Sequence, residues 1–237
     1  MVNPIRSAGP TPAPFESGLH TNFRLKGINF QARLFTLNAN SFTKLGIDPR
    51  FFRPGLTLRV LDQANYSRFC KLAGFPEGQL GGFYPLAPAG EEVMVNDGRL
   101  ARLPDLSRVL VLPEKFSFLG TLHEVLHDVF LGGALSLEER NGFTRLVLAA
   151  TRRVLNTAPD SEEARFIKNV AAEWKVPLDL TGIRNHELIP RRPSREERIF
   201  ANEMFAYAGE KKITGDNKMG QIPEEIDTYL DRIEIKL

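Results

Sequence analysis

Three residues whose side chains can bind a metal ion and move a proton lie within five positions of the chain. His123, Glu124 and His127 form the pattern H-E-x-x-H. If this segment is helical, the two histidines share one face, one turn apart, so both imidazoles can reach a single ion. Glu124 then lies beside the ion, where a carboxylate can take a proton from a water molecule that the metal activates. The pattern predicts a metal site built for hydrolysis.

Zinc is the ion that this pattern favours. Two imidazoles and a carboxylate, with a fourth position left for water, are typical of a catalytic zinc site. The single cysteine, Cys70, excludes a multi-cysteine metal cluster and an internal disulfide, and we expect it to fill space in the core. The predicted cofactor is therefore Zn²⁺. The alternative interpretation of the motif is a partly exposed helix with two solvated histidines.

The third ligand is predicted to be a carboxylate further along the chain, because no third histidine follows at the metzincin spacing. Glu203 lies in the middle of an apolar stripe of a predicted helix. The other residues of the stripe are Ile199, Phe200 and Tyr207. A lone buried carboxylate would cost several kcal/mol, or shift its pKa and stay neutral, and a metal ion removes that cost. The alternatives are pairing with an arginine of the 191–198 cluster, or a place at the solvent edge.

The two helical motifs together resemble the gluzincin metallopeptidases. The first is His123–His127, and the second is Asn202–Ala206, which reads N-E-M-F-A. The E-x-F-A part is similar to the anthrax lethal factor-like peptidases, the Pro-Pro endopeptidases and the Mlc titration factor A family. The resemblance covers only these two helices. It implies a zincin-like fold, a peptide or protein substrate, Glu203 as third zinc ligand and Glu124 as general base.

The chain departs from these families in the length of the stretch between His127 and Glu203. That stretch is longer than expected, so the helices predicted within 136–174 would be an insertion between the two metal-binding elements.

A second departure concerns the group that stabilises the oxyanion. The families place a catalytic tyrosine seven residues before the ligand glutamate, and this chain has Glu196 there. An active peptidase needs a positioned donor, typically worth about 3–4 kcal/mol of barrier. We rank His186 first, with Tyr207 and either Arg191 or Arg192 as the alternatives.

The elements around these motifs predict an α+β chain in which a small twisted sheet precedes a helical part. Strands are expected at 23–35 (one or two), 56–61, 81–84, 92–95 and 108–112, with a helix at 63–73 capped by Asp62. Helices are expected at 116–131, 136–155 and 160–174, then from Ser194, and finally with Pro223 in the first turn. The helices that begin at Ser136 and Ser194 are expected to start with capping boxes, formed with Glu139 and Glu197. Residues 175–193 are expected to be a loop. The strand at 81–84 or at 92–95 is a candidate edge that pairs with a substrate peptide, or simply a structural hairpin.

The predicted domain organisation follows from this change of pattern. Residues 1–18, which are rich in proline, are expected to form a flexible tail. Residues 19–237 are expected to form one zincin-like catalytic domain. Its upper α/β lobe spans about 19–131 and its lower helical lobe about 132–237, with the active-site helix between them.

Composition narrows the classes of partner. The chain has 237 residues, 42% of them hydrophobic and 25% charged, which suits a globular protein with a sizeable core. A net charge of +2 is low for a nucleic-acid binder, and the arginines near 191–198 are interspersed with glutamates. We therefore expect no nucleic-acid partner. No apolar run suits a bilayer or an ordinary secretory signal, so a cytoplasmic protein is the default, and a leaderless export route is compatible.

These observations predict a zinc-dependent peptidase with Glu124 as its general base. The alternative is a non-catalytic zincin-fold regulatory or binding protein whose zinc site is structural or vestigial. Sequence alone gives neither the substrate and cleavage specificity nor the oligomeric state.

Overall fold

The computed structural model describes residues 19–25, 27–54, 56–73, 92–94, 100–102, 109–115, 117–131, 134–173, 193–216 and 218–233. The chain divides into two compact units. The first contains Met1–Leu45 and Pro54–Glu124, and the second contains Gly46–Arg53 and Val125–Leu237. Helix α3 (Phe118–Leu131) continues through this division without a break. The predicted lobes, 19–131 and 132–237, stay a prediction.

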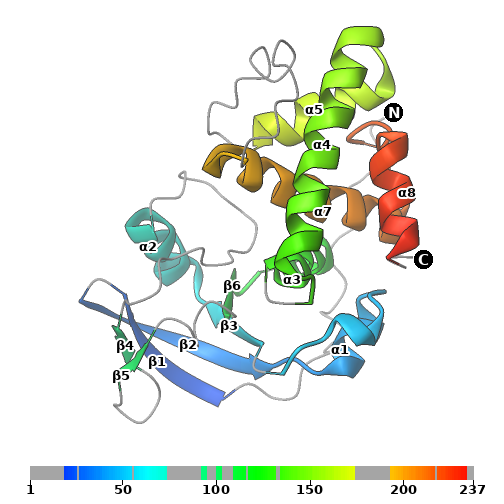
Figure 1. The fold of residues 1–237 in the computed structure, drawn as a ribbon. Helices are drawn as coiled ribbons and strands as arrows, with labels where there is room; N and C mark the ends of the chain where they lie inside the picture. The colour runs from blue at the N-terminus through cyan, green and yellow to red at the C-terminus, as the bar shows by residue number, and fades with distance from the viewer. Residues whose placement is uncertain are drawn as a thin grey trace, which may run out of the picture. The chain divides into compact units, whose positions relative to one another are not determined.

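The first unit contains a four-stranded sheet (Figure 1). Its strands are β1 (Leu19–Leu25), β2 (Ile28–Thr36), β3 (Thr57–Leu61) and β6 (Val109–Pro113), in the order β1-β2-β3-β6. The first two pairs are antiparallel and the β3–β6 pair is parallel. Gly27, at φ +82°, makes the tight turn between β1 and β2, a backbone conformation that favours glycine.

The core of this unit forms where β3 and β6 pair. Leu58 faces Leu110 and Val60 faces Leu112 in register, and all four side chains are buried. Helix α2 (Gln63–Ala73) contacts both strands. Its first turn is capped as the sequence predicts, because the backbone N–H of Asn65 donates to the Asp62 carboxylate at 2.8 Å.

Two short strands complete the described part of the first unit. β4 (Glu92–Met94) and β5 (Leu100–Arg102) form a separate antiparallel pair, and β4 contacts β1. Helix α1 (Ala39–Lys44) follows β2 and has Asn38 as its N-cap.

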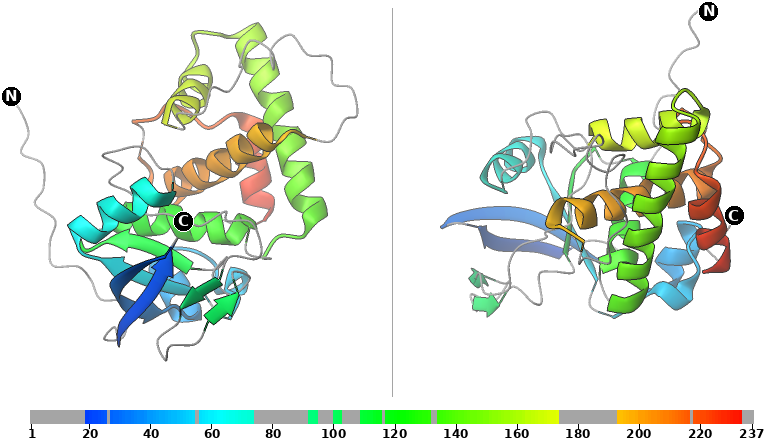
Figure 2. Two further views of the ribbon diagram at one scale, coloured as in Figure 1. Left: turned by 90° about the vertical axis from the view of Figure 1, so that its left-hand side faces the viewer. Right: turned by 45° about the horizontal axis from the view of Figure 1, so that its top comes forward.

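The second unit is helical. It contains α4 (Leu137–Thr157), α5 (Glu162–Glu173), α7 (Arg195–Thr214), α8 (Glu224–Arg232) and the short 3₁₀ helix η1 (Pro49–Phe51). The long helix α4 contacts α5, α7 and α8 (Figure 2). An aromatic cluster lies at the centre, where the Phe143 ring lies 5.6 Å from Phe130, 5.5 Å from Phe205 and 4.8 Å from Tyr229, measured between centroids.

The mixed α+β class is confirmed, with strands first and helices second. The region predicted at 23–35 forms two strands, β1 and β2. Both predicted capping boxes are present, Ser136 with Glu139 and Ser194 with Glu197. Pro223 is the N-cap of α8 rather than a residue of its first turn. The sequence analysis did not predict α1, η1 and β5.

Some predicted segments lie outside the described residues. They are the tail at 1–18, the strand at 81–84 and, apart from Pro193, the loop at 175–193. Among the residues that are described, no helix combines the length and the apolar character needed to cross a bilayer.

Candidate metal centre

Helix α3 carries the H-E-x-x-H motif and is held by its apolar face. Its first turn is closed by Ser117, whose hydroxyl accepts from the backbone N–H of Gly120 at 2.9 Å. Leu122, Val125, Leu126 and Val129 are all 0% exposed. Because these side chains fix the rotation of the helix, the directions of His123 and His127 are also fixed.

Helix α7 carries Glu203 and begins at a complete capping box. The backbone N–H of Ser194 donates to the Glu197 carboxylate at 2.6 Å, and the Glu197 N–H donates to the Ser194 hydroxyl at 3.1 Å. All residues from Phe200 to Ala206 are buried, so Glu203 lies in a segment enclosed on every side. The single apolar stripe expected from sequence therefore understates how deeply this helix is buried.

A glycine lets α7 approach α3 closely. A Cβ atom at Gly209 would lie 3.1 Å from both terminal methyl groups of Leu126, closer than ordinary van der Waals contact. Leu126 precedes His127 in α3, and Gly209 lies under two turns after Glu203 in α7. The close approach thus helps to bring the Glu203 carboxylate to the His127 imidazole.

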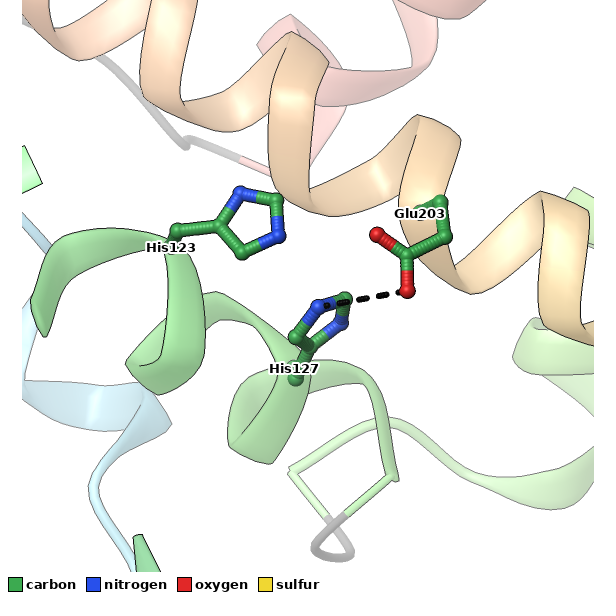
Figure 3. A group of neighbouring side chains, drawn as sticks. All are labelled: His123, His127 and Glu203. Atoms are coloured by element: carbon green, nitrogen blue, oxygen red, sulfur yellow. Dashed lines mark ion pairs between the residues drawn. The ribbon is translucent and has the colours of Figure 1, made fainter. Parts of the chain in front are cut away.

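His123, His127 and Glu203 form a group that could hold a metal ion, and their side chains are shown in Figure 3. One ligand atom from each residue lies within 4.8 Å of the others. The Nε2 atom of His127 is 3.6 Å from Oε1 of Glu203. Because α3 is unbroken, the helix itself places His123 one turn before His127.

Burial argues against the solvent-exposed positions that were the alternatives for His127 and Glu203. His127 is 5% exposed and Glu203 is 7% exposed, so neither is a solvated side chain at the edge of a helix. His123 is half-buried. Within the arginine cluster, Arg198 donates to the Pro193 carbonyl, whereas Arg191 and Arg192 lie outside the described residues.

The spacing of the group suits one small ion. Two ligand atoms about 2.1 Å from a tetrahedral zinc lie about 3.4 Å from each other. The 3.6 Å between His127 and Glu203 is close to that value, and the 4.8 Å bound requires a contraction of at most about 1.4 Å. Two imidazoles and a carboxylate fit zinc by their donor chemistry, and the identity of the ion stays a prediction.

Two further carboxylates of α3 are buried beside the ligand group. Glu124 is 5% exposed and Asp128 is 1% exposed. A carboxylate in so little contact with water needs compensating partners, and a cation nearby supplies one. The predicted role of Glu124 as general base stays a prediction.

Sequence reasoning missed a residue near Glu124. Tyr66 of α2 is 1% exposed; burial raises the pKa of its hydroxyl far above the usual value, and Cys70 and then the Glu124 charge add to the shift. Tyr66 is therefore a neutral hydroxyl close to the predicted base. The only signal in the sequence is the i, i+4 spacing of Tyr66 and Cys70, which says nothing about a partner on another helix.

Of the predicted oxyanion donors, only Tyr207 lies among the residues that the structure describes. Tyr207 is half-buried in α7, one turn after Glu203. His186 lies outside the described residues, as do the two arginines offered as alternatives. Glu196, at the position where the resembling families have tyrosine, is exposed. The roles of His186 and Tyr207 stay predictions.

Comparisons of the chain with protein-family models, with curated proteins and with solved structures found no match. The class of protein is therefore defined by the fold and the side-chain group alone, and only in broad terms. The protein is a mixed α+β chain with a largely buried His-His-Glu group that could hold a metal ion.

Proposed function

We propose that the protein is a zinc-dependent peptidase whose metal is held by His123, His127 and Glu203. The observation that carries this proposal is the convergence of these three side chains from two helices, with the buried Glu124 next to the first ligand. Closed structural zinc sites use four cysteine or histidine ligands, whereas two histidines and one glutamate leave a position for water. The site thus suits a hydrolase of the gluzincin type that the two motifs resemble.

When bound, zinc supplies Lewis acidity, which lowers the pKa of water towards about 7 and polarises a carbonyl group. The rest of the chemistry belongs to the chain. The Glu124 carboxylate accepts a proton from the attacking water and delivers it to the nitrogen of the leaving amine. Its burial keeps bulk water from exchanging with that proton.

The developing negative charge on the peptide oxygen needs a donor from the protein. Tyr207 offers a hydroxyl from the same helix as Glu203, one turn later and half-buried. His186 is the other candidate. A positioned donor contributes typically about 3–4 kcal/mol to lowering the barrier.

Two measurements on one set of variants test the proposal. Zinc per chain is determined by elemental analysis after dialysis against a weak chelator, and turnover is followed with a peptide library. We expect about one zinc per chain and cleavage by the wild type. Glu124→Gln should keep the zinc and lose turnover by about 10²-fold or more, because a general base contributes that much. His127→Ala should lose both.

The matched control is Glu138→Gln, an exposed glutamate in the first turn of α4, which should behave as the wild type. Retained turnover in Glu124→Gln would remove that residue from the role of base. A wild type that binds zinc but cleaves no peptide would instead indicate a structural or binding role for the metal. No zinc uptake at neutral pH would overturn the proposal.

A further inference from the structure

A short segment from the first half of the chain belongs to the helical unit. Gly46–Arg53 follows α1 and precedes β3, both elements of the first unit, yet it groups with Val125–Leu237. We call this segment the strap. It contains η1, which Asp48 caps by accepting from the backbone N–H of Arg50 at 2.8 Å. The strap is therefore a structured part of the second unit whose flanking elements both belong to the first.

The first anchor of the strap is a close contact with α7. Gly46 has φ +78°, and a Cβ atom there would lie 2.8 Å from Cγ2 of Ile213, near the C-terminal end of α7. Ile213 is buried and β-branched, so its methyl group has little freedom to turn away. The strap thus lies directly on the helix that carries Glu203.

The second anchor is a hydrogen bond to the end of α8. The Arg50 guanidinium donates from Nη2 to the carbonyl of Ile233, the C-cap residue of α8, at 2.5 Å. A cation is favourable at this end of a helix, where the last backbone carbonyls have no partner within the helix. Ile47 and Phe51 of the strap are also buried. A short segment with few anchors opens locally at a lower free energy than a core helix does.

We propose that the strap and the metal centre are coupled through α7. Glu203 and Ile213 lie on this unbroken helix, about 15 Å apart along its axis. A docked strap and a bound ion both favour the same position of α7, so metal binding tightens the strap and release of the strap weakens metal binding. Such coupling is reciprocal and typically changes an affinity about 5–150-fold. The inference rests on the proposed zinc site, but it does not require peptide cleavage.

Hydrogen exchange of the strap tests the coupling from the metal side. The full chain is followed by mass spectrometry with and without zinc. The amides of interest are those of Phe51 and Phe52, which donate to the carbonyls of Asp48 and Pro49 at 3.1 and 3.0 Å. We expect zinc to slow their exchange about fivefold or more, because a docked strap protects them. Zinc that binds to the chain and leaves this exchange unchanged would overturn the coupling.

Two variants test the coupling from the strap side. Gly46→Ala crowds Ile213, and Arg50→Ala removes the hydrogen bond to the end of α8. Arg50 is exposed, so Arg50→Ala should fold as the wild type does. Each variant should speed exchange of the strap and weaken zinc binding, measured by competition with a chromophoric chelator, by about fivefold or more. Faster exchange without weaker zinc binding would overturn the coupling.

Each variant has a matched control in the same unit. Gly215→Ala also places an alanine at a positive φ, +69°, but its Cβ atom would meet nothing within 4 Å. Arg145→Ala truncates an exposed arginine of α4. Both controls should keep the zinc affinity and the strap exchange of the wild type. Controls that weaken zinc binding as much as Gly46→Ala and Arg50→Ala would show that the effect is not specific to the strap, and would overturn the coupling.

The outcomes separate this inference from the proposed function. Strap amides that zinc protects in a chain that cleaves no peptide would support the coupling while the peptidase proposal fails. Cleavage by a zinc-loaded chain whose strap exchanges at the same rate with and without zinc would overturn the coupling and leave the peptidase proposal standing. A chain that takes up no zinc would overturn both.

Discussion

Glu203 is a buried acidic residue, and the cost of its burial restricts the kinds of site to which it can belong. Glu203 is 7% exposed, and its Oε1 atom lies 3.6 Å from Nε2 of His127, which is also buried. Taking a carboxylate out of water costs several kcal/mol unless a partner compensates, and removing one member of a buried pair leaves the other uncompensated. A metal ion held between Glu203 and the two histidines would compensate all three groups together. We therefore expect Glu203 to contribute more to metal binding than to the free energy of folding.

Replacing Glu203 tests that distinction. Glu203→Gln should weaken zinc binding by about 100-fold or more, since an amide is a poor substitute for an anionic ligand. In the metal-free protein, the same variant should change the free energy of unfolding by less than about 1.5 kcal/mol, because removing the buried charge and losing its pair with His127 have opposite effects. Competition with a chromophoric chelator measures the affinity, and urea unfolding measures the stability.

The control for Glu203→Gln is Glu138→Gln, an exposed position in α4, which should change neither quantity. Unchanged zinc affinity in Glu203→Gln would exclude Glu203 as a ligand and leave His123 and His127 without the third donor that α7 provides.

At the scale of elements, the packing of α7 on α3 sets the geometry of the site. Leu126 is 0% exposed, so its methyl groups cannot turn into solvent when a new atom appears at Gly209. At this separation of the two helices, an alanine at position 209 would require the Leu126 side chain to shift by a few tenths of an ångström, and the residues on either side of this contact depend on the same separation. By contrast, Gly142 of α4 is exposed, and a Cβ atom there meets nothing within 4 Å.

Two glycine-to-alanine substitutions should therefore change the free energy of unfolding in opposite directions or by different amounts. Gly142→Ala should raise the free energy of unfolding by about 1 kcal/mol, because alanine favours a helix over glycine by that amount. Gly209→Ala gains the same helix propensity but crowds Leu126. We therefore expect the free energy of unfolding of Gly209→Ala to be lower than that of Gly142→Ala by about 1–3 kcal/mol. Gly209→Ala should also weaken zinc binding, which Gly142→Ala should not change. Urea unfolding and chelator competition give both quantities.

A second variant identifies the cause. If crowding is responsible, Gly209→Ala should cost less in a Leu126→Val background, because contacting residues couple in a double-mutant cycle. Equal effects of Gly142→Ala and Gly209→Ala in the wild-type background would contradict the close approach.

The same scale shows what sequence can and cannot reveal. Periodicity and capping signals predicted α2, α4 and α7 closely, because a helix start depends on residues that are near each other in the chain. The grouping of His123, His127 and Glu203 was also predictable, since two histidines on a helix and a glutamate in an apolar helix both demand partners. The effect of the Glu124 charge on the buried Tyr66 was not predictable, because tertiary packing decides which groups lie near each other.

Across the whole helical unit, ion pairs attach α8 to its neighbours. Arg153 of α4 donates to both oxygens of Glu225, with Nη2 to Oε2 at 2.8 Å, and also to Glu163 of α5 at 3.2 Å. On the other side of α8, Lys212 of α7 pairs with Asp227 and with Asp231. The last helix of the described chain is therefore joined by ion pairs to two others, α4 and α7, in addition to the burial of its apolar face.

This arrangement makes part of the stability depend on pH in a calculable direction. The hydrogen bonds from Arg153 hold the pKa of the Glu225 carboxyl below its usual value, against the opposing effect of burial. A carboxyl whose pKa is lower in the folded chain stabilises it fully above the unfolded pKa of about 4.3. That contribution is lost as the pH falls through the lower, folded value.

Glu225→Gln should therefore be less stable than the wild type at pH 7, by up to about 1 kcal/mol, because the pair is partly exposed and screened by solvent. The difference should shrink as the pH falls below the unfolded pKa of about 4.3 and disappear once the pH lies below the lower, folded pKa of Glu225. Urea unfolding at pH 7, 5, 4 and 3 measures it, with Glu224→Gln, an exposed neighbour on α8, as the control. A difference that stays constant over this range would mean that Glu225 acts through shape and packing, so that its charge does not hold α8 to α4.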